Sequence, residues 1–369
     1  MTTKENILFV HHEKSSGGAA RSLYDLILQF LKKGRFNCFL IAPEGYLTNT
    51  LSANCNVEPL SLIRFKRTIN PLCLLKYAVF YLIVSARIMV FCKKHNISVV
   101  YANSLNAFLY CLMARAFGKI CLVLHLRDRI PSCFPKWLIR VSCRKVICIS
   151  AYIENQVNNV LPSSKHCVIY NGIDPNRFTV KKTNYSKVVG YAGQIIPWKR
   201  VDLLIASMKL ITQTVPDVQL LIAGADLYND HPDYLNKLKN EIVRLGLNGN
   251  VRLCGWLEDI SVFLSQIDIL VLPSEGEPFG RILIEAMATG VPVVGVNSGA
   301  IPEIIDNEKT GLLCESSAKS ISESVLRLFY NNELRADLID NGRTKVKNRF
   351  NIINTAESIH KIVEGILTP

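Results

Sequence analysis

Short apolar segments alternate with helix-length stretches along the whole chain, and this alternation restricts the fold more than any other feature. The segments form two series, at residues 7–10, 38–41, 98–101, 121–125, 146–150 and 168–170, and then at 188–192, 218–223, 250–253, 269–272 and 291–296. Strand–helix–strand units of this kind build parallel sheets, and fully apolar strands lie in sheets that are covered on both faces. The pattern therefore predicts an α/β protein with two doubly wound, Rossmann-like domains.

The length and composition agree with two folded domains. The chain has 369 residues, of which 49% are hydrophobic and 20% charged, so disordered and low-complexity classes are excluded. The periodicity breaks between residues 171 and 186, where Asn-Gly and Asp-Pro turns occur. We expect an N-terminal domain at residues 1–176, a C-terminal domain at 177–350 and a terminal helix at 351–369.

The charge is divided unevenly between the two halves. Residues 1–180 hold 23 Lys and Arg against 8 Asp and Glu, a net charge of +15, whereas residues 181–369 hold 20 against 22, a net charge of −2. This asymmetry predicts that the first half meets a polyanionic partner or an anionic membrane surface. Nucleic acid is not expected as a partner, because the chain has no nucleic-acid motif and no interleaved basic and aromatic pattern.

The cysteines and the first residues bear on location. The twelve cysteines include no Cys-x-x-Cys pair, and most lie in apolar runs such as 146–149, where a free thiol acts as a small hydrophobic residue. Residues 1–18 contain no apolar run of the length that a secretion signal needs. We therefore expect a cytoplasmic protein with reduced thiols.

Two glycine-bearing loops each follow the first strand of a series. Gly17 and Gly18 precede a helix in the first domain, and the loop at 193–200 precedes a helix in the second. Doubly wound sheets bind ligands at the carboxyl ends of their strands, where backbone amides at a helix start can hold a phosphate. Taken alone, either loop also fits an ordinary tight turn.

The most informative segment is 272–294, in which a strand, an acidic Gly-Pro loop, a helix and another strand follow one another. Pro278 suits the first position of this helix. A helix that begins there places Glu285 about 12 Å along its axis from Glu277 and near the azimuth of Pro278, so the two carboxylates could line one cleft. The amides around Gly280 suit a diphosphate, and the carboxylates suit hydroxyl-rich groups beside it. For an arbitrary pair of glutamates, a helix-dipole partner and a solvated carboxylate would be the alternative.

This segment resembles the nucleotide-binding signature of the retaining family 4 glycosyltransferases, the group 1 transferases of the GT-B fold, whose hallmark is Glu, seven residues, Glu. Here the hallmark is Glu277 and Glu285, set in Glu-Pro-Phe-Gly and Glu-Ala-Met-Ala-Thr-Gly-Val-Pro-Val-Val. The likeness covers the second half of the chain, also at residues 171–174, 193–199, 221–224, 255–256, 299–304 and 310–313. In the first half it is looser and depends on Gly17, Gly18 and His125.

The resemblance implies a GT-B architecture, in which two Rossmann-like domains face each other across a cleft. The N-terminal domain would receive the acceptor and the C-terminal domain the nucleotide-sugar, and the terminal helix would cross back to the N-terminal domain. The implied reaction moves a sugar from a nucleotide-sugar to a glycan or lipid-linked acceptor hydroxyl with retention of anomeric configuration, in cell-surface polysaccharide biosynthesis.

The resemblance also implies roles for single residues of the second domain. Glu277 would contact the donor sugar near its reacting carbon, and Phe279 and Gly280 would offer backbone amides to the same sugar. Glu285 would hold the ribose hydroxyls, and Lys199 would neutralise the diphosphate.

Further donor contacts are expected from Gly193, Arg281 and Ile282. From the first domain, Gly18, next to Gly17, would close over the phosphates, and His125 would reach the sugar from the acceptor side. We take Glu277, His125 and Lys199 as the catalytic candidates.

Gln194 departs from the family pattern, which usually has arginine five positions before the lysine. An amide donates a hydrogen bond but offers no formal charge to a leaving diphosphate, so Arg200, Arg281 or Arg21 would have to compensate.

The chain contains no Asp-x-Asp pair, and we expect no metal and no cofactor beyond a UDP-sugar or GDP-sugar as substrate.

Six of the seven histidines, all except His125, lack ligand-like spacing and are expected at the surface or at helix caps.

Residues 71–92 form the most apolar helix-length stretch, with an uncharged centre of only ten residues, 77–86. About 20 apolar residues are needed to span a bilayer. We expect a helix buried against the first sheet or one that lies partly in the lipid interface, with Arg64, Lys66, Arg67, Lys76, Arg87, Lys93 and Lys94 meeting phosphates.

Two other functions share the fold. A nucleotide-sugar epimerase would change its sugar without an acceptor, and a binding subunit would recognise a glycan or a protein without turnover. Neither alternative is excluded by the residues alone.

Overall fold

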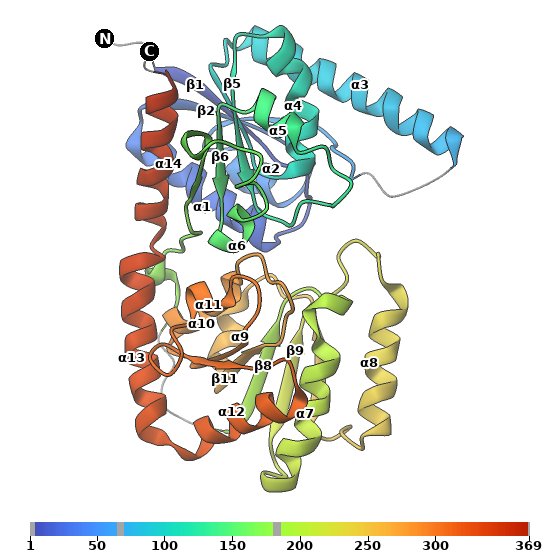
Figure 1. Cartoon of the computed structure of the whole chain (residues 1–369), viewed down its shortest axis with the longest axis vertical. Helices are drawn as coiled ribbons and strands as arrows, with labels where there is room; N and C mark the ends of the chain where they lie inside the picture. The colour runs from blue at the N-terminus through green and yellow to red at the C-terminus, as the bar shows by residue number, and fades with distance from the viewer. Residues whose placement is uncertain (1–3, 65–69, 180–185, 368–369) are drawn as a thin grey trace. The chain divides into compact units, whose positions relative to one another are not determined.

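The computed structural model describes residues 4–64, 70–179 and 186–367, and Figure 1 shows its elements. The chain forms two compact units, one of Met1–Gly172 with Ile352–Pro369 and the other of Ile173–Asn351. The division thus falls at Gly172, within the stretch where the sequence periodicity breaks.

The first unit is built on a seven-stranded parallel sheet in the order β3-β2-β1-β4-β5-β6-β7. Its strands are β1 (Glu5–Val10), β2 (Phe36–Ala42), β3 (Asn56–Pro59), β4 (Val99–Ala102), β5 (Cys121–Leu126), β6 (Lys145–Cys148) and β7 (His166–Val168). Its helices are α1 (Gly18–Lys33), α2 (Tyr46–Leu51), α3 (Pro71–Lys94), α4 (Leu105–Phe117), α5 (Trp137–Ser142), α6 (Ala151–Glu154) and α14 (Ile352–Leu367).

The second unit is built on a six-stranded parallel sheet in the order β10-β9-β8-β11-β12-β13. Its strands are β8 (Val188–Ala192), β9 (Gln219–Ala223), β10 (Val251–Gly255), β11 (Ile269–Leu272), β12 (Val293–Val296) and β13 (Leu312–Cys314). Its α-helices are α7 (Val201–Thr214), α8 (Pro232–Arg244), α9 (Ile260–Gln266), α10 (Arg281–Thr289), α11 (Ile301–Ile304), α12 (Ala318–Tyr330) and α13 (Asn332–Arg349).

Both sheets have the strand order 3-2-1-4-5-6 at their centre, which confirms the two Rossmann-like domains predicted from the sequence. In this order the direction of winding reverses between the first and fourth strands. The loops that follow these two strands diverge and leave a crevice where ligands bind in such sheets. The loops of interest therefore follow β1 and β4 in the first unit, and β8 and β11 in the second.

The C-terminal helix α14 belongs to the first unit and covers the sheet next to α1. Ile359 and Val363 of α14 share a core with Phe9 and Phe30. The Thr355 hydroxyl also donates a 3.0 Å hydrogen bond to the carbonyl of Tyr170. Burial of these apolar side chains is the main force that holds the last helix on this sheet.

Helix α3 differs from the expectation of a helix buried against the sheet. Only Val84, Ser85, Ile88 and Cys92 are buried, and α3 packs chiefly on α4. Its N-terminal half projects from the first unit in Figure 1. Among the described residues, α3 is the one helix long and apolar enough to cross a membrane by length and composition, with a mean hydropathy of 1.8 and 17% burial over its apolar window.

Candidate functional site

The loops that follow β8 and β11 meet at the switch point of the second sheet. The Glu275 amide donates to the carbonyl of Trp198 over 3.0 Å. The Nζ atom of Lys199 lies 2.6 Å from Oε2 of Glu277. Two loops that are about 80 residues apart in sequence, 193–199 and 274–280, are thus held together at the carboxyl edge of the sheet.

The Lys199–Glu277 ion pair is largely shielded from water, with side chains that are 14% and 7% exposed. Lys199 also lies over the ring of Trp198, with Nζ 4.4 Å from the ring centroid. An ammonium group has three N–H donors. One of these donors bonds Glu277, which leaves two N–H groups for other acceptors.

Gly299 fixes the backbone of Glu277 from a third strand end, after β12. Its φ of +62° is in the left-handed region, and a Cβ atom there would lie 2.4 Å from the amide nitrogen of Glu277 and 2.5 Å from its carbonyl oxygen. The next residue, Ala300, donates a 2.8 Å hydrogen bond to that carbonyl. Only glycine allows so close an approach at this φ, so the loop of Glu277 has little freedom to shift.

Helix α10 begins three residues later than the sequence indicates. Gly280, with φ +92°, is its N-cap and Arg281 its first residue, so Pro278 lies in the loop. The prediction that Pro278 occupies the first helical position is therefore wrong, because a left-handed residue starts the helix instead. Phe279 is buried against Phe350, with ring centroids 6.0 Å apart, so any ligand contact from Phe279 would come from its backbone.

Glu285 lies on α10 and pairs with Arg281 one turn earlier, with Nε 2.7 Å from Oε1 and side chains 7% and 13% exposed. Because Glu277 is outside the helix, the spacing of about 12 Å derived from helical geometry does not apply to the two glutamates. A carboxylate has acceptor sites beyond one bond to arginine. Ile282, half-buried in the first turn, belongs to the stretch of helix whose amides have no intrahelical partner.

The loop after β8 positions Gly193 and Gln194. The Gly193 amide donates to the carbonyl of Ala223 over 3.0 Å, and the Tyr191 hydroxyl donates to the carbonyl of Gln194 over 2.7 Å. The Gln194 side chain is half-buried. The backbone of this loop is thus held by its neighbours.

Two of the three arginines expected to compensate for Gln194, Arg200 and Arg281, have carboxylate partners of their own. Arg200 pairs with Glu275 and lies 3.6 Å from Asp202, and Arg281 pairs with Glu285. Their positive charges are therefore offset within the unit, and neither stands in directly for the missing arginine.

The switch point of the first sheet lies between the loops after β1 and β4. Gly17 is the N-cap of α1, and Gly18 is its first residue, with no side-chain cap and no acidic residue in the first turn. His11, which directly follows β1, is fully buried, and its Nδ1 atom lies 3.0 Å from Nδ2 of Asn103 after β4. His12 lies 2.9 Å from the Ser104 hydroxyl.

These positions correct the expectation that His11 lies at the surface or at a cap, and His360 is likewise buried, against Phe30 and Phe36. Burial, then neighbouring His12, then Arg127 lower the pKa of His11 well below its usual value. Burial lowers the pKa of His12 to about 4. Both rings are consequently neutral at pH 7.

His125 on β5 belongs to a buried polar network centred on Arg127. The Arg127 guanidinium donates to Oδ1 of Asn103 (2.7 Å), to Oδ1 of Asn171 (2.8 Å) and to Nδ1 of His125 (3.1 Å), and the Tyr101 hydroxyl also contacts that Nδ1 atom. Burial, and next the charge of Arg127, lower the pKa of His125 well below its usual value.

Arg127 determines which atoms of this network carry protons. A guanidinium can only donate, so Nδ1 of His125 accepts and the neutral ring carries its proton on Nε2. Asn103 accepts through Oδ1, so its Nδ2 donates to Nδ1 of His11, whose proton is then also on Nε2. Within the described residues, both Nε2 atoms are buried and lack a hydrogen-bond partner. Each ring thus offers an N–H donor.

The sequence reasoning missed Arg127, Asn103, Tyr101 and Asn171 as parts of this network. The available signal was local: Asn103 and Arg127 are the first polar residues after the apolar strands β4 and β5. The described residues contain no group of three or more His, Cys, Asp or Glu side chains suited to a metal ion.

Two family models match the chain. The model described as glycosyl transferases group 1 matches residues 173–345, and the model described as glycosyltransferase family 4 matches residues 16–177. Together they cover both units, and the first includes the whole of the Lys199–Glu277 and Arg281–Glu285 site.

Among curated proteins, the chain is 25% identical over 342 residues to N-acetyl-alpha-D-glucosaminyl L-malate synthase of Bacillus anthracis, covering 85% of this chain and 88% of that protein. It is 30% identical over 225 residues to the capsular polysaccharide biosynthesis glycosyltransferase CapM of Staphylococcus aureus, covering 56% and 57%. Other curated relatives are likewise matched over about 60% of their length.

Among solved structures, the Anabaena protein Alr3699/HepE in complex with UDP-glucose has a TM-score of 0.84 and 23% identity over 98% of this chain and 99% of that one. At this level of identity the likeness supports the fold, and it agrees with the two parallel sheets described above.

Proposed function

Because this chain belongs to the group 1 glycosyltransferases, we propose that it transfers a sugar from a UDP-sugar or GDP-sugar to a glycan or lipid-linked hydroxyl, with retention and without a metal. The observation that carries the proposal is the shielded Lys199–Glu277 pair at the switch point of the second sheet, next to the start of α10. Polysaccharide biosynthesis is proposed as the setting because CapM is named for that process.

The donor would lie along the loops that follow β8 and β11. Glu277, whose backbone is fixed by Gly299, would accept hydrogen bonds from the sugar hydroxyls. Lys199 would share its remaining donors with the diphosphate. The first-turn amides of α10, from Gly280 to Ile282, would bind the same phosphates, since a helix start combines free N–H groups with a positive dipole. Glu285, positioned by Arg281, would accept from the ribose hydroxyls.

Breaking the anomeric bond leaves positive character on the sugar and negative charge on the diphosphate. Preorganised N–H donors and an ammonium group stabilise that developing negative charge more effectively when water is excluded. The acceptor hydroxyl would attack the face from which the phosphate departs, which gives retention, and the departing phosphate would help to take the proton of that hydroxyl. His125, with its proton on Nε2, would donate to the sugar or acceptor.

The acceptor is proposed to meet the first unit, because the first half of the chain carries a net charge of +15, with 8 acidic residues against 23 Lys and Arg. A lipid-diphosphate-linked sugar on the inner face of the cell membrane fits a net charge of +15. Cytoplasmic, membrane-peripheral location belongs to the same proposal.

The test is an assay of the purified chain with UDP- and GDP-sugars, in the presence and absence of acceptors. Transfer should need an acceptor, persist in EDTA and give a product with the donor's anomeric configuration by NMR. A changed sugar in the donor-only reaction would identify an epimerase instead. Donor binding with no turnover across an acceptor panel of lipid-linked, glycan and small hydroxy-acid compounds would favour a binding subunit.

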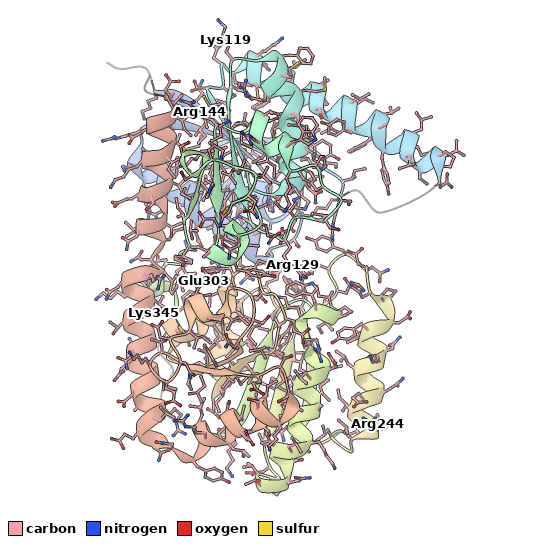
Figure 2. All side chains as sticks on the ribbon, in the orientation of Figure 1. Lys119, Arg129, Arg144, Arg244, Glu303 and Lys345 are labelled. Carbon is pink, nitrogen blue, oxygen red and sulfur yellow. The ribbon has the colours of Figure 1, made fainter. Side chains whose placement is uncertain are left out.

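The matching variant is Glu277→Gln, for which we expect at least a thousandfold loss of kcat/KM. Its control is Lys345→Met, which removes another shielded lysine of the second unit, 2.8 Å from Asp306 and labelled in Figure 2. This control should cost stability and leave specific activity unchanged. Equal activity of Glu277→Gln and the wild type would remove Glu277 from the proposed mechanism.

A further inference from the structure

The outward side of α3 is apolar and exposed. The large side chains Leu72, Leu75, Val79, Leu82, Ile83 and Val90 are between 47% and 68% exposed. Figure 2 shows the side chains of the projecting half of α3 without another element beside them. Leaving large apolar side chains in contact with water is unfavourable, and their burial is favourable. A patch of six on one helix therefore indicates a surface that something else covers.

Helical geometry places these residues in one stripe. At about 100° per residue, positions 72, 75, 79, 82, 83 and 90 fall within an arc of about 100°, whereas Val84, Ile88 and Cys92, which pack on the unit, lie on the opposite side. The stripe is about 27 Å long. The helix therefore has two apolar faces, one that packs on its own domain and one that points away from it.

The contacts of α3 with its own unit show whether the helix can span a membrane or can only lie on its surface. Val84, Ser85, Ile88 and Cys92 are buried in the unit, and the Tyr81 hydroxyl donates a 2.9 Å hydrogen bond to the carbonyl of Leu109 on α4. A helix fixed along its side to a polar-surfaced domain cannot cross the hydrocarbon core without breaking these contacts. A helix that lies flat keeps them and still immerses its outward stripe.

The charges along α3 favour an anionic lipid surface over a second copy of the chain. Residues 71–94 contain Lys76, Arg87, Lys93 and Lys94 and no Asp or Glu. Lys76, Arg87 and Lys94 lie about 70–90° from the stripe's centre line, all on one side, and so flank its edge. Arg87 lies 3.4 Å from the exposed Glu58. Two copies packed stripe to stripe would bring these cations together, whereas anionic headgroups would neutralise them.

We propose that α3 is the membrane-docking element of the protein, which lays its Leu72–Val90 stripe into the boundary between headgroups and acyl chains of an anionic bilayer. The proposal rests on the proposed membrane-peripheral location and gives it a named surface. It does not depend on sugar transfer, because the binding it describes needs neither donor nor acceptor. Lys66 and Arg67, also expected to meet phosphates, lie outside the described residues.

The test is co-sedimentation of the full-length chain with phosphatidylcholine vesicles and with vesicles that contain 30% phosphatidylglycerol, at low and high salt. We expect binding to the anionic vesicles, a loss of several-fold in affinity at high salt, and weaker binding to neutral vesicles. Leu75→Ser/Leu82→Ser should lower the affinity at least tenfold.

The control double variant is Val243→Ser/Val262→Ser, because Val243 and Val262 in the second unit are 63% and 55% exposed, against 62% and 54% for Leu75 and Leu82. It should bind vesicles like the wild type. A second readout uses Leu82→Trp, whose fluorescence should shift to the blue when anionic vesicles are added. Thermal unfolding verifies that each variant folds.

Three outcomes would overturn the proposal. The first is no binding to anionic vesicles, and the second is binding that the Leu75→Ser/Leu82→Ser variant retains in full. The third is a stable dimer that the same variant converts to monomer, which would assign the stripe to a second copy. A chain that binds vesicles through α3 but transfers no sugar would leave this inference standing and would refute only the proposed function.

Discussion

The second unit holds its strand-end loops with pairs of opposite charges, whereas the first unit holds them with neutral side chains around Arg127. Lys199–Glu277, Arg281–Glu285 and Arg200–Glu275 all lie near the carboxyl edge of the second sheet. At the corresponding edge of the first sheet, His11, His125, Asn103 and Tyr101 share hydrogen bonds and carry no net charge.

The difference teaches where each unit is vulnerable. A shielded ion pair fixes two side chains firmly, but the loss of one partner leaves an uncompensated charge. A neutral network instead fixes the positions of protons, and a change in protonation disrupts it. Removal of one charged side chain should therefore lower the stability and activity of the second unit. A decrease in pH should lower the stability of the first.

The largest effect is expected from a double-mutant cycle on the second unit. Lys199→Met and Glu277→Gln should each lower the free energy of unfolding by up to about 3–5 kcal/mol, because each variant leaves the charge of the other residue shielded from water and without its partner. The combination should cost less than the sum, since both charges are then removed. All three variants should be inactive.

Chemical denaturation and a transfer assay measure these two effects separately. The comparison cycle is Lys345→Met with Asp306→Asn, whose pair lies 2.8 Å apart with a half-exposed carboxylate. It should show smaller stability losses and unchanged specific activity. Additive losses in the Lys199–Glu277 cycle would show that the pair has no mutual stabilisation.

The second prediction addresses Arg127 as a positioning residue in the first unit. Arg127→Met should lower kcat by about 10²-fold, because His125 loses the donor that keeps its proton on Nε2. Arg127 also lowers the pKa of His125. Its removal should raise that pKa, so activity should fall at a higher pH on the acid side than in the wild type.

The pH–rate profile distinguishes this role from a structural one. Arg127→Lys keeps a donor and a charge and should recover part of kcat with the wild-type acid limb. A variant that is merely less stable would lose activity without a shift of that limb, and such a profile would contradict the positioning role.

The two units also differ in how well the sequence predicts them. The loop and helix from 274 to 290 could be assigned from residue order, because glycine and proline at fixed positions and two glutamates carry the signal locally. The switch-point rule brings the loops that carry Lys199 and Glu277 to the same edge of the sheet, but the ion pair between the two side chains was not predicted from the sequence. The helix start was misplaced because proline favours a first turn, and the left-handed Gly280 has no such simple signature.

In the first unit the network depends on contacts between distant segments. Arg127 bonds Asn103 and Asn171, which are 24 and 44 residues away, and no local pattern announces such a contact. Burial of His11 likewise depends on how β1 and β4 pair. The strands β3 and β13 were missed because they are short sheet edges of four and three residues, where the hydrophobic pattern is weakest.

The apolar stretch of α3 shows the converse error. Its hydrophobicity predicts a helix correctly, yet hydrophobicity does not specify what covers it. Because apolar residues occur around most of its circumference, the sequence could not tell the face that packs on α4 from the face that points outward.

The third prediction is that mild acid opens the first unit before the second. Burial holds the pKa of His11, His12 and His125 below the unfolded value of about 6.5. The unfolded state therefore binds more protons below pH 6.5, and stability falls as the pH decreases toward the folded values, which is about 4 for His12. Each histidine contributes up to about 1.4 kcal/mol per pH unit.

Hydrogen exchange measured by mass spectrometry at pH 7.5 and 5.5, corrected for intrinsic rates, checks this prediction. Peptides from β1, β4 and β5 should lose protection, whereas peptides from β8 and β11 should keep it, because the histidine of the second unit, His231, is exposed. His12→Gln should reduce the loss in the first unit. Equal loss in both units would contradict the comparison.

The smallest effect is expected from Gln194→Arg. Arg200 and Arg281 are already paired with carboxylates, so a new guanidinium would add charge that a leaving diphosphate can use. We expect nucleoside diphosphate to bind about 3- to 10-fold more tightly, measured by calorimetry, and kcat to rise by a similar factor if departure of the diphosphate limits the rate. Lys209→Arg on α7, at a more exposed position, is the matched control and should change neither. Unchanged affinity in Gln194→Arg would mean that the side chain at 194 does not face the diphosphate. The charges that hold the diphosphate would then come from other residues of the second unit.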